Sequence, residues 1–97
     1  MIRHTVQLRL RPDASESDAV AIIDALRTLP SKIDVIRSYT VCRDLGLEPS
    51  NAHIMLTAEF DDIAGYLEYA SHPDHISVIV DFIRPVVESR AACQIES

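Results

Sequence analysis

The chain opens on a strict alternation of apolar and polar side chains, which predicts a strand with one buried face over Ile2–Leu10. One histidine belongs to the apolar series, whose members are His4, Val6, Leu8 and Leu10. The simpler interpretation of this histidine is a core-edge residue that is hydrogen-bonded to the backbone. The sharper interpretation is a neutral imidazole that lines a pocket under the sheet.

The period then becomes helical. Ser15 is a favourable N-cap, and the spacing predicts a helix from there to about Leu29, where Pro30 ends it. The expected buried positions of this helix are Ala19, Ile22, Ile23, Leu26 and Leu29. β-Branched and aromatic residues predict a second strand from Val35 to about Asp44, followed by a loop that contains a glycine and a proline.

A third strand is expected over Asn51–Phe60, again with two distinct faces. Its apolar set is Ile54, Leu56, Ala58 and Phe60, and the opposite set is His53, Met55, Thr57 and Glu59. Because neighbouring strand residues point to opposite faces, His53 is expected to look away from any pocket on the apolar side.

Two helices and a strand complete the pattern. Asp61 or Asp62 caps a helix with Tyr69 beside its apolar stripe, which consists of Ile63, Tyr66, Leu67 and Ala70. Pro73 breaks that helix, and the next helix is expected to bury Ile76, Ile79, Val80 and Ile83. The last strand is expected over Val86–Glu96.

The resulting order is βαββαβ, with the second crossover split into two helices. Right-handed connections give an α+β fold with a ferredoxin-like antiparallel sheet, helices on one face, and the first and third strands in the centre. The uncovered face is expected to carry a mixed set, namely Met55, Tyr39, Val41, Thr5, Gln7 and Thr57. Two such faces stacked in a homodimer would be shielded from water.

Composition narrows the possible partners. The length suggests a single domain over residues 1–97, and 15 acidic against 9 basic residues give a formal charge of −6. This balance argues against nucleic acid and anionic membranes, which need a basic footprint. With no membrane-spanning run and no signal peptide, a cytoplasmic location is expected. Cys42 and Cys93 are expected to be semi-buried and on opposite sheet edges, too far apart for a bridge.

Candidate chemistry gathers between Glu59 and His75, which holds two of the four histidines and two of the three tyrosines. A neutral His75 would serve as a base beside a carbonyl, with the Tyr69 hydroxyl donating to the developing enolate oxygen. A purely structural set of turn and core residues is the alternative. A metal site is the weakest interpretation, because His72, Asp74 and His75 lack a clear further ligand.

Four segments resemble the stress-responsive A/B barrel (Dabb) family, namely the opening Arg-His-Thr-Val-Gln-Leu-Arg-Leu-Arg, Arg37–Tyr39, Glu59–Asp62 and His72–His75. The resemblance covers nearly the whole chain, and an early strand histidine paired with Tyr-x-x-His-Pro-x-His is fairly specific. It implies dimeric α+β barrels of ferredoxin-like halves, and therefore a homodimer. Most members of the family have no assigned reaction.

The olivetolic acid cyclase branch of the family catalyses a cofactor-free aldol cyclisation of a linear polyketide thioester. Resemblance to that branch implies that His75 and Tyr69 are catalytic, that His4 is its first-strand histidine, and that His72 is the other histidine of the turn. The position that matches the third-strand histidine of that branch is Ile54 in this chain. His53 is one residue early and would face the opposite side of the sheet.

These observations predict a pocket for a small hydrophobic or polyketide-like ligand. The protein is expected to act as a cyclase or isomerase without cofactor or metal, with His75, Tyr69 and His4 as its catalytic residues. The ligand-binding residues are expected to be His72, Tyr66, Val6, Leu8, Ile54 and Leu56. Two alternatives stay open. One is a non-catalytic dimeric stress-associated protein, and the other is a cofactor-independent monooxygenase of the related dimeric barrels.

Overall fold

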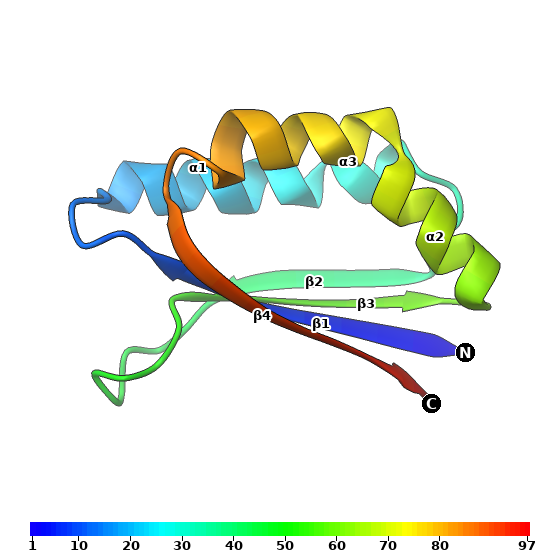
Figure 1. Cartoon of the computed structure of the whole chain (residues 1–97), viewed down its shortest axis with the longest axis horizontal. Coiled ribbons are helices and arrows are strands. Elements are labelled where there is room, and N and C mark those ends of the chain that lie inside the picture. Colours follow the sequence, from blue (N-terminus) through cyan, green and yellow to red (C-terminus); the bar gives the residue numbers. More distant parts are fainter.

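The computed structural model describes residues 1–97 as a four-stranded antiparallel sheet with all helices on one face (Figure 1). The elements are β1 (Ile2–Leu10), α1 (Glu16–Arg27), the 3₁₀ turn η1 (Leu29–Ser31), β2 (Ser38–Arg43), β3 (Ile54–Phe60), α2 (Ile63–Ser71), α3 (Pro73–Val78), the π-helical turn η2 (Ile79–Ile83) and β4 (Val87–Glu96). The strand order is β2-β3-β1-β4. The predicted ferredoxin-like topology, with β1 and β3 central, is confirmed.

The side chains of β1 alternate between the core and the uncovered face, as predicted. The strand pairs with β3 on one side and β4 on the other, so that His4 lies opposite Ala58 and opposite Gln94. Directly opposed residues share a face, which places all three on the helix side of the sheet. His4 is the one buried polar residue of the core, with 4% of its surface exposed.

α1 begins and packs where the sequence predicts. Ser15 Oγ accepts from the Asp18 backbone nitrogen at 3.1 Å, and Asp18 Oδ2 accepts from the Ser15 nitrogen at 2.9 Å. This capping box satisfies two otherwise unpaired donors at the helix start. The predicted apolar stripe is buried on the sheet, and Leu29, in η1, is fully buried beyond the end of α1.

The predicted buried faces of the second and third helices are wrong in part. Ile63 and Leu67 are exposed, as are Ile76 and Val80, whereas the buried positions are Gly65, Tyr69 and Val78. On α2 the residue that faces the core is Gly65, where an added Cβ would lie at ordinary contact distance, 3.7 Å, from the Cβ atoms of both Phe60 and Val35. Tyr69, one turn later on the same helix face, therefore enters the core.

Two residues of β2 were expected on the wrong face. Tyr39 lies opposite Ala58 and Val41 lies opposite Leu56, so both point toward the helices. The uncovered face instead carries Thr5, Gln7, Thr40, Cys42, Met55, Thr57, Ala91, Cys93 and Ile95. Both cysteines are free and exposed in the single chain rather than semi-buried, and they lie on opposite edge strands.

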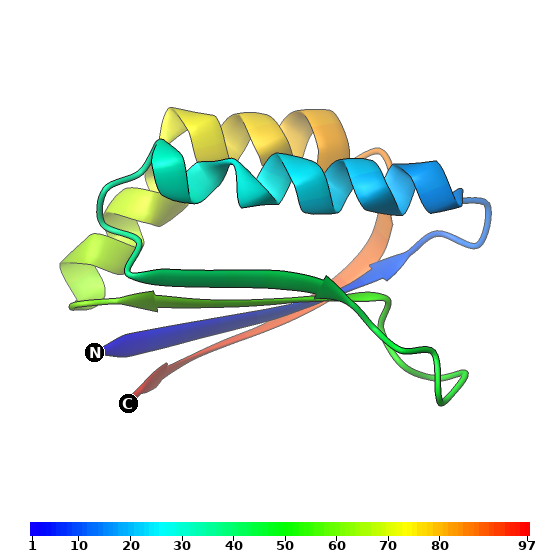
Figure 2. The same cartoon turned by 180° about the vertical axis from the view of Figure 1, so that it is seen from behind.

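β2 and β3 are both shorter than predicted, and the loop between them is correspondingly longer. β2 begins at Ser38 rather than Val35, and β3 begins at Ile54 rather than Asn51. The connecting loop extends below the uncovered face of the sheet, on the side away from the helices (Figures 1 and 2). No helix combines the length and the apolar character needed to cross a membrane.

Candidate functional site

The candidate site is a cavity of about 120 Å³ between the helix side of the sheet and the helical layer. Its lining is mostly apolar and consists of His4, Val6, Leu8, Leu26, Leu56, Tyr66, Tyr69, His75, Ile79, Ile83 and Arg90. Seven of the residues predicted from the sequence meet there, namely His4, Val6, Leu8, Leu56, Tyr66, Tyr69 and His75. Ile54 and His72 do not line it.

His4 is held in one orientation by the last strand. Its Nδ1 lies 2.9 Å from Gln94 Nε2. An amide nitrogen only donates, so Nδ1 accepts, and the ring proton of the neutral imidazole is then on Nε2. Burial lowers the pKa of His4 from 6.5 to about 4, assisted by the charge of Arg90 and by that of His75 when it is protonated. His4 is therefore a neutral hydrogen-bond donor at neutral pH.

His75 carries the opposite tautomer. Its Nδ1 lies 3.1 Å from the carbonyl oxygen of Ala70, which only accepts, so Nδ1 bears the proton. The lone pair is then on Nε2. Burial lowers the pKa of His75, against a smaller opposing effect of the Ala70 hydrogen bond. The ring is thus neutral, with a basic nitrogen, at neutral pH.

The Tyr69 ring packs against that of His75 at a tilt of 34°, with centroids 4.2 Å apart, and only 2% of the residue is exposed. Its hydroxyl lies 2.7 Å from the hydroxyl of Tyr39 on β2. Burial raises the pKa of Tyr69 to about 12, and the hydrogen bond with Tyr39 lowers it in opposition. Burial likewise raises the pKa of Tyr39. Both phenols are therefore neutral donors under ordinary conditions.

Tyr66 completes the aromatic wall. Its ring centroid lies 5.0 Å from that of His4 and 5.7 Å from that of Phe60. Tyr69 lies 6.2 Å from His4 by the same measure, in an edge-on arrangement. The two helix tyrosines thus contact the strand histidine from the helical layer, and the tilted ring of His75 completes the group.

His72 and Ile54 stabilise the surrounding fold and do not line the cavity. His72 Nδ1 accepts from the Asp74 backbone nitrogen at 3.1 Å and caps α3, with Pro73 as the first helical residue. This cap fixes the start of the short helix that carries His75. Ile54 is almost fully buried and lines a different hollow, near the β2–β3 loop.

His53 lies outside the cavity, as predicted, although not on a strand. It precedes β3, and its Nδ1 accepts from the Leu10 backbone nitrogen at 2.9 Å. The ring therefore satisfies a donor at the end of β1. Its role in the fold is to tie the start of β3 to the end of β1.

Three polar residues of the site were missed by sequence reasoning, namely Tyr39, Arg90 and Gln94. Arg90 lies opposite Leu8, and Gln94 lies opposite His4. Both belong to the face of β4 that points toward the helices. The alternation of β1 would have identified them once the β1–β4 register was known, but a single sequence does not give that register.

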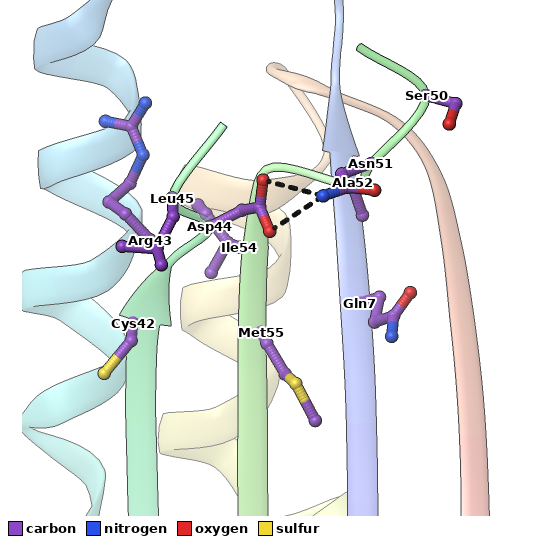
Figure 3. A pocket seen from close by; sticks show the side chains of 10 residues that line it. All are labelled: Gln7, Cys42, Arg43, Asp44, Leu45, Ser50, Asn51, Ala52, Ile54 and Met55. Atoms are coloured by element: carbon purple, nitrogen blue, oxygen red, sulfur yellow. Dashed lines mark hydrogen bonds between the residues drawn. The ribbon is translucent and has the colours of Figure 1, made fainter. Parts of the chain in front are cut away.

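A larger, open hollow of about 540 Å³ lies at the β2–β3 loop (Figure 3). Asp44 accepts hydrogen bonds from Asn51 across the loop, and Cys42, Met55 and Gln7 point toward the uncovered face. It contains no histidine or tyrosine. We therefore place the candidate chemistry in the smaller cavity. No group of three or more His, Cys, Asp or Glu side chains is arranged to hold a metal ion.

Comparison with known proteins gives a consistent result. The family model for the Stress Responsive A/B Barrel Domain matches residues 2–97. A dimeric ferredoxin-like protein of unknown function from Thermobifida fusca YX is 30% identical, with a TM-score of 0.90 over 99% of this chain and 90% of that one. A similar dimeric protein from Bacteroides fragilis is 29% identical (TM-score 0.86), over 99% of this chain and 95% of that one.

A third solved structure is of a protein from the same family. A Dabb family protein with a ferredoxin-like fold from Mesorhizobium loti is 25% identical, with a TM-score of 0.83 over 99% of this chain and 95% of that one. Among curated proteins, none matches the sequence. The solved relatives thus support the fold and a dimeric assembly of such chains. They identify no reaction, so the chemistry has to be inferred from the site.

Proposed function

The chain belongs to the stress-responsive A/B barrel domain family, and on that premise we propose that it binds a small carbonyl compound between His4 and His75 and catalyses cofactor-free proton transfer. The reaction class is that of an isomerase or cyclase, in which a proton leaves the carbon beside a carbonyl. His75 is the base, and Tyr69 and His4 are hydrogen-bond donors to the oxygen.

The pair of opposed tautomers carries this proposal. Ala70 holds the proton of His75 on Nδ1 and leaves a lone pair on Nε2, while Gln94 leaves His4 with a proton on Nε2. The two imidazoles therefore offer one base and one donor within a single apolar cavity. A neutral base and a preorganised donor are what enolisation requires.

Tyr69 supplies the second donor. When Tyr39 donates to the Tyr69 oxygen, the Tyr69 proton is left for a ligand. Tyr39 is then a positioning residue, which orients the Tyr69 hydroxyl and lowers its pKa. A negative charge that develops on the ligand oxygen would be shared between Tyr69 and His4.

The size of the cavity limits the ligand. At about 120 Å³ it is close to the volume of a site that holds benzene, on the order of 150 Å³. A single six-membered ring or a short chain therefore fits. A linear polyketide thioester would have to leave most of its length outside, so small cyclic ketones and short β-keto compounds are the preferred substrates.

We also propose that the chain forms a homodimer through the uncovered face of the sheet. The relatives from T. fusca and B. fragilis are described as dimeric. The face itself combines threonines with Met55, Cys42, Cys93 and Ile95, and it lacks the charges of a fully solvated surface except at its margins. Stacking would cover these groups.

The test is deuterium exchange. The protein is incubated in D₂O with a panel of cyclic ketones and short β-keto thioesters, and loss of the α-proton signal is followed by NMR. We expect exchange above the buffer rate that falls at least about 100-fold in His75→Gln, the usual scale for a removed base. His53→Asn, a change outside the cavity, is the matched control. Equal rates in the wild type and His75→Gln would refute the mechanism.

A further inference from the structure

Arg90 is the one cationic side chain in the lining of the cavity. It lies on the edge strand β4, opposite Leu8 and on the same face as Gln94. Its backbone position is therefore fixed by the sheet, on the side that carries both histidines. Figure 1 shows β4 as the strand at the edge of the sheet, passing under the helical layer.

The guanidinium of Arg90 has no partner within the protein. Arg3, Arg37 and Arg43 form ion pairs with carboxylates. Arg9 and Arg27 donate to backbone carbonyl oxygens. No hydrogen bond or ion pair engages Arg90, although a guanidinium offers five donors in a planar fork.

The charge of Arg90 acts on the whole site. It adds to burial in lowering the pKa of His4 and of His75, and it opposes the larger effect of burial that raises the pKa of Tyr69. The two histidines are themselves neutral at neutral pH, so the cavity is a cationic spot in a chain whose formal charge is −6. The positive charge of Arg90 thus favours an anionic ligand over a neutral one in this cavity.

We infer that Arg90 binds the carboxylate of a small organic acid, whose apolar ring or chain enters the cavity among Val6, Leu8 and Leu56. This inference rests on the proposed function and narrows its substrate class to carboxylic acids or their keto derivatives. The planar fork matches a carboxylate in a two-point contact. A ring of benzene size fills the volume available behind it.

Arg90 would also orient the ligand. With the carboxylate held at the partly exposed end of the cavity, the rest of the molecule is directed toward the aromatic wall and the two histidines. The residue is then a specificity-determining residue, which selects the ligand by charge and leaves proton transfer to His75. A neutral ligand of the same shape can still enter but lacks this contact.

Binding of benzoate and of benzamide, which share a ring but differ in charge, tests the inference. Both are titrated into the wild type and into Arg90→Gln, with the imidazole resonances of His4 and His75 as the NMR readout. Arg84→Gln, which removes an unpaired arginine outside the cavity lining, is the control. We expect benzoate to bind the wild type at least about tenfold more tightly than benzamide, as for a charge-assisted hydrogen bond.

In Arg90→Gln this preference should vanish while benzamide binding is unchanged, and Arg84→Gln should behave as the wild type. Equal affinity of the two ligands for the wild type, with shifts at both histidines, would overturn the role of Arg90 and leave the proposed cavity intact. No shift at either histidine with either ligand would overturn both. Inorganic phosphate that displaces benzoate at equal concentration would overturn the assignment to carboxylates.

Discussion

His4 and Gln94 come from opposite ends of the sequence and meet across neighbouring strands, with Gln94 Nε2 2.9 Å from His4 Nδ1. Because an amide nitrogen can only donate, this contact determines which nitrogen of the buried imidazole carries the proton. Replacing Gln94 therefore changes the chemistry offered by His4 without touching the histidine.

Gln94→Leu should leave a buried acceptor without a partner and lower the free energy of unfolding by about 1–3 kcal/mol. Denaturant unfolding measures that loss. Gln94→Glu should reverse the tautomer, because a carboxylate accepts from Nδ1, and raise the pKa of His4. The ¹⁵N shifts of the imidazole distinguish the two tautomers. Unchanged ¹⁵N shifts in Gln94→Glu would show that Gln94 does not select the tautomer.

Acid should destabilise the fold through His4. Its pKa is about 4 in the folded state against 6.5 for an unperturbed histidine, so the unfolded chain binds a proton more readily. Stability is therefore full above pH 6.5 and falls as the pH drops toward 4, by at most about 3 kcal/mol from this residue. Urea unfolding of the wild type and His4→Gln at pH 7.5 and 4.5 would measure it. A similar pH dependence in His4→Gln would contradict the assignment.

The hydroxyl pair of Tyr39 and Tyr69 should be worth about 1 kcal/mol of stability, the usual net value of a hydrogen bond. Tyr39→Phe removes the hydrogen-bond partner of the Tyr69 hydroxyl and should also slow the proposed exchange reaction. A double-mutant cycle with Tyr69→Phe isolates the coupling between them. Tyr66→Phe is the control, because the Tyr66 hydroxyl makes no hydrogen bond. A coupling near zero would mean that the two hydroxyls act independently.

Gly65 should resist any larger side chain. An added Cβ would lie 3.3 Å from Asp62 Oδ1, the oxygen that caps α2, and 3.7 Å from the side chains of the buried Phe60 and the partly buried Val35. Gly65→Val is therefore expected to lower the free energy of unfolding by about 1–3 kcal/mol, as overpacking does. A thermal melt measures it. Ala64→Val, at the exposed neighbouring position, is the control and should cost under about 1 kcal/mol.

A single charge in the centre of the uncovered face should prevent the proposed homodimer. Thr57 lies on β3 between Thr5 and Thr40, on the face away from the helices. Thr57→Glu is expected to give a monomeric mass by light scattering, where the wild type gives twice that mass, because a buried unpaired charge is costly. Ile63→Glu, on the exposed side of α2, should remain dimeric. A monomeric wild type would contradict the stacking of sheets.

Much of the fold follows from the alternation of β1 and β3 and from the capping box at Ser15, because these patterns are local. The rotation of α2 was missed since the apolar residues Ile63 and Leu67 suggested another buried face. In the fold, the face with Gly65 and Tyr69 packs against Phe60 and Val35, which lie outside the helix. A single sequence does not display such a contact.

The site divides in the same way. His4, Tyr69 and His75 could be found from the chain because each sits in a recognisable local pattern. Tyr39, Arg90 and Gln94 could not, because their facing depends on how the edge strands are aligned with the central ones. His72 was assigned to ligand binding, whereas its ring nitrogen caps α3.

Arg90 and Gln94 lie four residues apart on the edge strand β4, so both side chains point to the same face of the sheet. Side chains on a strand alternate with a period of two, so a one-residue insertion early in β4 would turn both away from the cavity at once. Such a change would leave His75 in place while removing the proposed anion contact and the hydrogen bond from Gln94 to His4 together. The side of the sheet that both residues face is thus set by the register of one edge strand, independently of the helical layer.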